Sequence, residues 1–227
     1  MPEFDRFSGD YAQILDRSTA MFGDGSEYFA EHKARYLATL VTGGFGGKIL
    51  DFGCGVGLLS RFITIHMPSA ALHGFDVSSA SIDAMDPRLR NRGRFTSCFD
   101  DLDTDYAVIV VSNVMHHIRP DERQHTVSQL ATRIAAGGRL VVFEHNPLNP
   151  LTRWVVSHCL FDEDAILLPR RETVRYMKNA GLPVSRRDFV LFFPRILSWM
   201  RPLERRLAWC PLGAQYVVVA EKQRVDE

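Results

Sequence analysis

Short apolar runs alternate with longer amphipathic stretches between about residues 48 and 145. The apolar runs predict strands over residues 48–52, 71–76, 94–98, 106–112 and 139–144. The amphipathic stretches predict helices over residues 58–66, 79–85 and 120–136, with Pro120 in the first turn of the third helix and Gly137-Gly138 at its end. Strands that alternate with helices favour a mostly parallel sheet covered by helices on both faces.

Two segments lie outside this alternation. Residues 1–45 have a helical periodicity, with Tyr36, Leu37 and Leu40 roughly on one face. Residues 147–212 contain a predicted helix over 171–180 that Gly181 closes, a strand over 184–193 and an apolar helix over 196–207, before a last strand over 215–221. The aromatic side chains of this second segment are expected mostly in the core, with some left to line a pocket for an apolar or aromatic ligand.

The charge balance and the cysteines narrow the classes of partner. Lys plus Arg equal Asp plus Glu at 27 each, so no net field attracts a nucleic-acid backbone, and we expect no nucleic-acid partner. The four cysteines form no CxxC pair, so neither a metal site nor a disulfide framework is expected. No uncharged apolar run approaches about 20 residues, and the amino terminus lacks the features of a signal peptide. We therefore expect a cytoplasmic protein without stable membrane insertion.

A glycine-rich turn follows the first predicted strand of the core. Gly53, Gly55 and Gly57 lie between that strand and the helix over residues 58–66. Glycines at such a turn let the backbone bend sharply and approach a ligand, and the amino end of the helix suits an electron-rich group. Dinucleotide-binding proteins use the same device, so the turn alone does not identify its ligand.

The spacing of the glycines and two acidic residues distinguish a dinucleotide from a ligand that carries a sulfonium. The spacing is GxGxG, because Leu58 stands where the dinucleotide pattern GxGxxG requires its third glycine. Asp51, two residues before the first glycine, would repel a pyrophosphate but suits a cationic ligand with an amino group and a sulfonium. Asp76 ends the second strand, where a carboxylate would accept hydrogen bonds from both hydroxyls of a ribose. The alternative is that both acids only cap helices or turns.

These motifs resemble the class I S-adenosylmethionine-dependent methyltransferases. The resemblance rests on ILDFGCGVG at residues 49–57, FDVS at 75–78 and SNVMHHI at 112–118, and it covers roughly residues 47–145. It implies a Rossmann-like, doubly wound α/β sheet, mostly parallel with an antiparallel last strand. It also implies S-adenosylmethionine as cofactor and S-adenosylhomocysteine as product.

The same resemblance implies which residues hold the cofactor. The glycine turn with Asp51 would hold the methionine portion, Asp76 the ribose, and the backbone of Asn113 would touch the methionine portion. For the contact with the adenine ring the register between residues 97 and 101 is open, because Cys98 stands at a position that is often aspartate; we expect Phe99 against the ring and Asp100 nearby. The expected cofactor-binding residues are Asp51, Gly53, Cys54, Gly55, Asp76, Val77, Phe99, Asp100 and Asn113.

Two histidines are candidates for a general base. His116 follows the fourth strand and His145 the fifth, so both lie at the edge of the sheet where ligands bind. Histidine titrates near neutral pH and suits proton transfer. The alternative is that these histidines are structural, because alignment of the nucleophile and exclusion of water supply much of the acceleration of methyl transfer.

The sequence thus predicts methyl transfer to an O, N or C nucleophile of a small molecule. The (Asp/Asn)-Pro-Pro-aromatic motif of base-modifying relatives is absent after the fourth strand, where Ser112-Asn113-Val114-Met115 stands. The alternatives are a non-catalytic cofactor-binding scaffold, or an enzyme that catalyses another reaction around the sulfonium. We expect one domain, with a helical cap at 1–45, a cofactor-binding core at 46–146, a substrate-side insert at 147–212 and a last strand and tail at 213–227.

Overall fold

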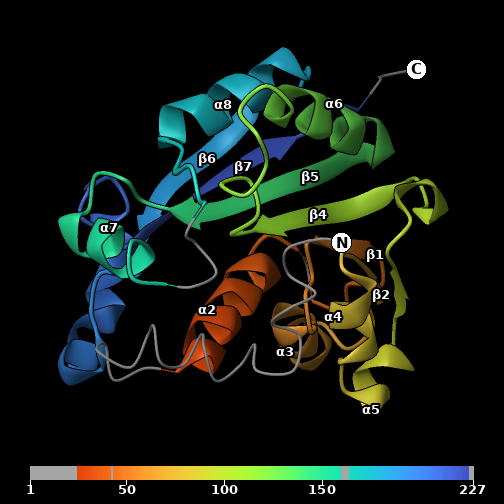
Figure 1. Ribbon diagram of the computed structural model, residues 1–227, viewed down its shortest axis with the longest axis horizontal. Coiled ribbons are helices and arrows are strands. Elements are labelled where there is room, and N and C mark those ends of the chain that lie inside the picture. Colours follow the sequence, from red (N-terminus) through yellow and green to blue (C-terminus); the bar gives the residue numbers. More distant parts are fainter. Residues whose placement is uncertain (1–24, 42, 160–163, 225–227) are drawn as a thin grey trace.

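A single seven-stranded sheet forms the centre of the molecule (Figure 1). The computed structural model describes residues 25–41, 43–159 and 164–224. The strand order is β3-β2-β1-β4-β5-β7-β6; β7 pairs antiparallel with both β5 and β6, and the other pairs are parallel. This confirms the predicted doubly wound sheet with its antiparallel last strand. The strands are β1 (Lys48–Phe52), β2 (Ala71–Phe75), β3 (Arg94–Thr96), β4 (Tyr106–Ser112), β5 (Ile134–His145), β6 (Val184–Val190) and β7 (Gln215–Glu221).

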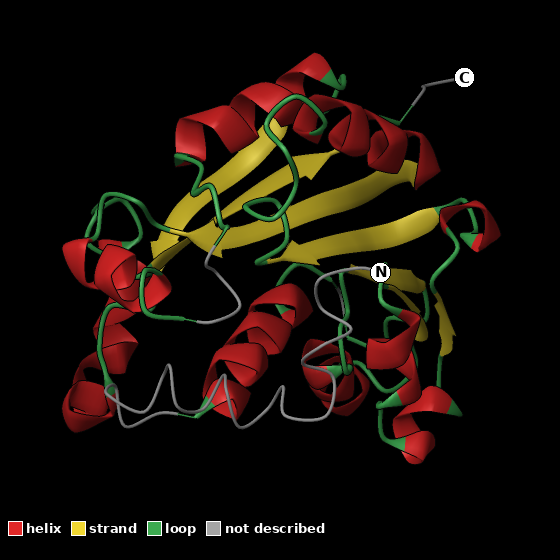
Figure 2. Ribbon diagram, in the orientation of Figure 1, coloured by secondary structure: helices red, strands yellow, loops and turns green. Residues whose placement is uncertain are grey.

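Helices cover both faces of the sheet, as predicted (Figure 2). Because successive side chains of a strand point to opposite faces, Val108 and Val110 of β4 join one core while Ile109 and Val111 join the other. Helices α2 (Ser26–Ala38) and α3 (Leu58–His66) pack on the first face, and α6 (Arg123–Arg133) and α8 (Arg170–Asn179) pack on the second. The apolar run of β4 is therefore a strand buried on both sides.

The remaining helices are short. They are α4 (Ser79–Asp83), α5 (Pro87–Arg90), the 3-10 helix η3 (Phe99–Asp101), α7 (Pro150–Val156), the 3-10 helix η5 (Arg195–Leu203) and α9 (Glu204–Leu207). The expected apolar helix over residues 196–207 is thus wrong. Leu197 has non-helical backbone angles, and Pro202 has no N–H to donate to an α-helical ladder. Strand β6 also ends before the predicted residue 193, because Leu191 adopts a φ of 62°.

The helix predicted over residues 120–136 is shorter at both ends. Pro120 lies in a turn before α6, whose first residue is Arg123, and the buried Arg123 side chain donates to the carbonyls of Ile118 and Ile166. Gly137 and Gly138 do not end the helix but lie inside β5. Gly137 has a φ of 75°, and the pairing of β4 with β5 shifts register there. The glycines therefore form an irregularity in the strand.

Gly138 offers a test of this close packing. A Cβ at Gly138 would lie 2.7 Å from the carbonyl oxygen of Tyr106, whereas one at Gly46 would have its nearest neighbour at 3.7 Å. We expect Gly138→Ala to lower the free energy of unfolding by about 1–3 kcal/mol, the usual effect of overpacking. Gly46→Ala should change it by less than about 1 kcal/mol. Urea unfolding of the two variants measures both values, and equal stabilities would contradict the packing described here.

Candidate functional site

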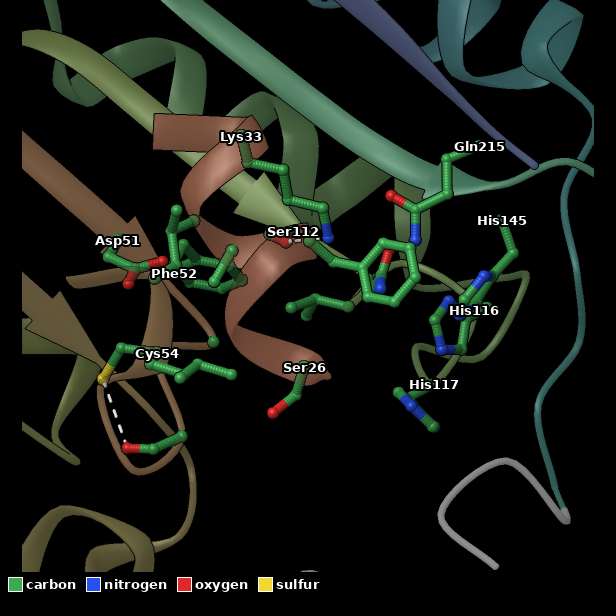
Figure 3. Close-up of a pocket in the computed structure, with 18 of the residues that line it drawn as sticks. Ser26, Lys33, Asp51, Phe52, Cys54, Ser112, His116, His117, His145 and Gln215 are labelled. Atoms are coloured by element: carbon green, nitrogen blue, oxygen red, sulfur yellow. Dashed lines mark hydrogen bonds between the residues drawn. The ribbon is translucent and has the colours of Figure 1, made fainter. Parts of the chain in front are cut away.

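A cavity of about 630 Å³ lies at the carboxyl ends of β1, β2 and β4 (Figure 3). Its floor is the glycine turn after β1 and the loop after β4, and α2 forms one wall. His145 at the end of β5 and residues after β6, including Phe192, close the other side. Of the predicted site residues, those that line the cavity are Asp51, Gly53, Cys54, Gly55, Asp76, Val77, Phe99, Asn113, His116 and His145.

The glycine turn has the backbone that its sequence predicts. Gly53, Gly55 and Gly57 all have positive φ angles, of 78°, 51° and 83°. A Cβ on Gly53 would collide with the side chain of Val114, so only glycine fits between the turn and the loop after β4. The amides of Gly53 and Cys54 donate to the carbonyl of Phe75 at 2.7 and 2.9 Å. The turn is therefore fixed against the end of β2.

Asp76 both shapes this turn and borders the cavity. Its Oδ2 accepts a hydrogen bond from the Gly55 amide at 2.8 Å, and its Oδ1 accepts one from the Ser78 amide at 2.9 Å. The alternative that Asp76 stabilises a turn is therefore correct. Asp76 also lines the cavity, and its ionised carboxylate is an acceptor for hydrogen-bond donors of a ligand.

Asp51 is a buried carboxylate at the end of β1. The hydroxyl of Ser60 donates to its Oδ2 at 2.7 Å. Burial raises the pKa of Asp51 to about 6; the Ser60 hydrogen bond opposes this rise and the nearby charge of Asp76 adds to it. A cation in the cavity would therefore stabilise the ionised form of Asp51.

Lys33 of α2 brings a buried cation to the same cavity. Its Nζ donates to the hydroxyl of Ser112 at 2.8 Å and lies 5.9 Å from the ring centroid of Phe143. Burial lowers the pKa of Lys33 to about 8, although the charges of Glu144 and Asp51 oppose the shift. The sequence prediction missed Lys33. The available signal was a lysine between Ala30 and Leu37 on the apolar face of a helix.

Two amide side chains present unsatisfied acceptors at the cavity. Asn113 adopts a φ of 56°, which asparagine tolerates better than most residues. Its backbone N–H donates to the carbonyl of Phe143. Its Oδ1 is buried without a hydrogen-bond partner, as is Oε1 of Gln215 at the start of β7. Both residues line the cavity. Buried acceptors usually have hydrogen-bond partners, so a ligand with N–H or O–H groups could donate to these two oxygens.

His116 is held by a carboxylate that the sequence prediction did not include. Glu144, fully buried in β5, accepts from Nδ1 of His116 at 2.6 Å and from the amides of Val114 and Met115 at 3.0 and 2.7 Å. Burial by itself would raise the pKa of Glu144. The charge and hydrogen bond of His116, the charge of His145 and the Met115 amide together hold it below its usual range. Glu144 is thus ionised at neutral pH and fixes both the loop and the imidazole.

The rings of His117 and His145 lie beside the ring of His116 and are tilted relative to it (Figure 3). The centroid of the His116 ring lies 4.1 Å from that of His117 and 5.1 Å from that of His145. All three line the cavity, on the side away from the glycine turn. The predicted base candidates are therefore neighbours, although His116 is buried and His145 is partly exposed.

The opposite end of the cavity contains Phe99 and Val77. The Phe99 ring makes edge contacts with Phe52 and Phe75, and the guanidinium of Arg133 lies 4.5 Å from its centroid. Asp100, predicted beside it, is exposed and does not line the cavity. Because the backbone turns in the 3-10 helix η3, the adjacent side chains of Phe99 and Asp100 point in different directions.

No group of three or more metal-ligating side chains suited to an ion occurs in the part of the chain that the structure describes. Among the same residues, no helix is both long and apolar enough to cross a bilayer.

Comparison of the sequence with known proteins gives two matches. Residues 50–140 match a family model described as a methyltransferase domain. A 112-residue stretch is 30% identical to an uncharacterized methyltransferase of Schizosaccharomyces pombe, and it covers 43% of this chain and 38% of the relative. The chain thus matches well under half the length of that protein.

Solved structures share the fold over most of the chain. A S-adenosylmethionine-dependent methyltransferase from Archaeoglobus fulgidus has a TM-score of 0.67 at 14% identity, covering 87% of this chain and 95% of its own. Magnesium protoporphyrin IX methyltransferase from Synechocystis, solved with bound S-adenosylhomocysteine, has a TM-score of 0.66 at 17% identity, covering 96% and 97%. At these identities the similarity is one of fold.

The buried lysine generates a prediction about stability. Below pH 8 the folded protein holds a charged Lys33 out of water, which is unfavourable. We expect Lys33→Met to raise the free energy of unfolding at pH 7 by about 1–3 kcal/mol. Between pH 8 and the usual lysine pKa of 10.5 the unfolded chain binds the proton more tightly, so the wild type gains stability and the difference shrinks.

Urea unfolding at pH 7 and pH 10 measures this difference. Lys222→Met, which alters a partly buried lysine outside the cavity, is the comparison variant. A less stable Lys33→Met protein at pH 7 would contradict this prediction, because it would show that the charge of Lys33 stabilises the fold.

Proposed function

We propose that this member of the class I S-adenosylmethionine-dependent methyltransferase superfamily transfers the sulfonium methyl group of its cofactor to a nucleophile of a small molecule. One observation carries the proposal. The glycine turn, Asp51 and Asp76 border the same cavity as the histidine cluster, so a cofactor site is continuous with room for an acceptor.

The charges of the cavity fit the amino-acid end of the cofactor. Asp51 would bind the ammonium group, and Lys33 the carboxylate. Each of these side chains is buried, and each charge favours the ionised form of the other. The unsatisfied Oδ1 of Asn113 offers a further acceptor for the ammonium group. Burial disfavours the charged forms of both side chains and so lowers the stability of the fold. Binding of the two charged groups of the cofactor would explain why this site contains them.

The nucleoside end would lie toward β2 and β3. Asp76 would accept hydrogen bonds from the ribose hydroxyls, with the turn held in place by its bond to the Gly55 amide. The ring would lie against Val77 and Phe99, because both line the cavity there. Phe99 is kept in position by its edge contacts with Phe52 and Phe75. The exposed Asp100 is left out of this assignment.

His116 is the proposed general base. When bound, the cofactor supplies an electrophilic methyl group on its sulfonium. Since Glu144 is ionised, it accepts the proton of Nδ1, and the lone pair of the neutral imidazole is then on Nε2. Nε2 can take a proton from an acceptor hydroxyl or amine, and Glu144 stabilises the imidazolium that forms. His145 is the second candidate.

The walls of the acceptor end are apolar. Tyr28 and Phe29 from α2 face Phe192 and Phe193 from the segment after β6. Such a lining favours an acceptor with an apolar or aromatic body, whereas Gln215 and the histidines can orient its polar group. Residues 147–212 would thus serve as the substrate-side insert.

The ribose assignment is tested with a matched pair of acids. Asp76→Ala removes charge-assisted hydrogen bonds, so we expect at least about tenfold to hundredfold weaker binding of S-adenosylhomocysteine. Asp100→Ala changes an exposed acid outside the cavity and should leave the affinity within about twofold. Titration calorimetry gives both dissociation constants. An unchanged affinity for Asp76→Ala would refute the ribose role, and no binding by the wild type would refute the cofactor site.

The base assignment is tested by transfer of a radiolabelled methyl group into a cell extract. We expect His116→Ala to lower the labelling rate by about 10²–10⁴-fold, and Glu144→Gln to shift its pH profile. His125→Ala, an exposed histidine on α6, serves as the control. Full activity in both His116→Ala and His145→Ala would remove histidine from the mechanism. Label in no compound, with cofactor binding intact, would favour a non-catalytic scaffold.

A further inference from the structure

All three tryptophans of the chain are exposed. The exposed fractions are 46% for Trp154, 75% for Trp199 and 74% for Trp209. The sequence placed most aromatic residues of this segment in the core, and for the tryptophans that expectation is wrong. None of the residues of η5 is buried, and Ile196 at its start is 84% exposed. Large apolar side chains gathered on a surface commonly mark an interaction site.

These tryptophans come from segments that lie together at one end of the sheet. Figure 1 shows α7 at the same end as the blue helical turns that follow β6. The side chain of Asn149, which begins α7, donates to the carbonyl of Leu212, and the Phe189 amide donates to the carbonyl of Ala208. We define the tryptophan face as the exposed residues Arg153, Trp154, Ile196, Trp199, Arg205, Arg206, Trp209 and Leu212.

The exposed charges of this face are positive. Residues 195–212 contain four arginines and one acid, Glu204. Glu204 faces inward, because its Oε1 accepts from the amides of Phe192 and Phe193 at 3.0 and 3.1 Å. Arg205 and Arg206 are exposed, and within the described residues neither forms an ion pair. A chain of zero net charge thus carries a local cationic patch interleaved with tryptophan.

The face adjoins the acceptor end of the cavity. Phe192, Phe193 and Pro194 line the cavity directly before η5 begins. The guanidinium of Arg201 lies 3.8 Å from the ring centroid of Tyr28 and donates to the Phe193 carbonyl, which ties η5 to the cavity wall. On the other side of the face, Leu151 and Val155 of α7 also line the cavity.

We infer that the tryptophan face docks on the surface of an anionic lipid bilayer. Tryptophan favours the interface between headgroups and hydrocarbon, and arginine is attracted to anionic headgroups. Docking of this kind is peripheral and requires no helix that crosses the bilayer. A second copy of the chain fits less well, because an isologous dimer through this face would place Arg205 and Arg206 of both copies together.

Docking would turn the apolar end of the cavity toward the bilayer. An acceptor with a hydrocarbon or aromatic body could then pass from the bilayer into the cavity, which Phe193 and Leu151 help to line, without crossing water. This second step rests on the proposed function, whereas docking itself does not and can be measured without cofactor or turnover.

Tryptophan fluorescence reports directly on the docking. With vesicles of phosphatidylcholine plus phosphatidylglycerol, we expect a blue shift of the emission and co-sedimentation of the protein, both weakened by salt. Vesicles of phosphatidylcholine alone should bind far less. Arg205→Glu with Arg206→Glu, and Ile196→Ser with Trp199→Ser, should each lower the affinity by about tenfold or more. Ile65→Ser, which changes an exposed residue of α3, should leave it unchanged.

Three outcomes would overturn the inference. The first is the absence of binding to either kind of vesicle, and the second is equal binding to both. The third is concentration-dependent dimerisation in light scattering that the Ile196→Ser, Trp199→Ser protein loses, which would make the face a self-association surface. Calorimetry with S-adenosylhomocysteine separates this result from the proposed function, because docking variants should keep the wild-type affinity for the cofactor product.

Discussion

The buried carboxylate of Glu144 holds the functional end of the molecule together. It lies in β5, yet its three hydrogen bonds go to the loop that follows β4, two to backbone amides and one to His116. A buried charge must be compensated, and here the loop and the imidazole provide the compensation. The same loop carries Val114, whose side chain fixes the glycine turn from the other side. One carboxylate thus links the cofactor turn, the base and the central strands.

Much of the fold could be predicted because its signals are local. Strands β1, β4 and β7 and helix α3 begin and end where their patterns indicate. The glycine turn has a motif of its own, and it lies within residues 50–140, which match the family model described as a methyltransferase domain. The elements that failed depend on long-range contacts. Gly137 and Gly138 look like a helix end, yet the approach of the Tyr106 backbone makes them part of a strand.

The residues of the site also differ in how far the sequence alone could predict them. Residues within a motif, such as Asp51, Asp76 and Asn113, line the cavity, whereas Asp100 fell outside it once the backbone turned at η3. Lys33 and Gln215 belong to no motif, because they reach the cavity only through the packing of α2 and β7 against the sheet. Their roles depend on distances across the fold. The exposure of Trp199 depends likewise on the packing of η5, none of whose residues is buried.

The cysteines of the chain differ sharply in chemical access. All four lie in the described part: Cys98 is exposed, Cys210 is partly exposed, and Cys54 and Cys159 are buried. Burial, reinforced by the charges of Asp51 and Asp76, raises the pKa of the Cys54 thiol, so the cysteine within the glycine turn stays protonated and resists alkylating reagents. Cys98 stands directly before Phe99. A maleimide dye attached to Cys98 would therefore lie at the rim of the proposed adenine site and leave the glycine turn unmodified. Its fluorescence could then report ligand binding without any substitution in the chain.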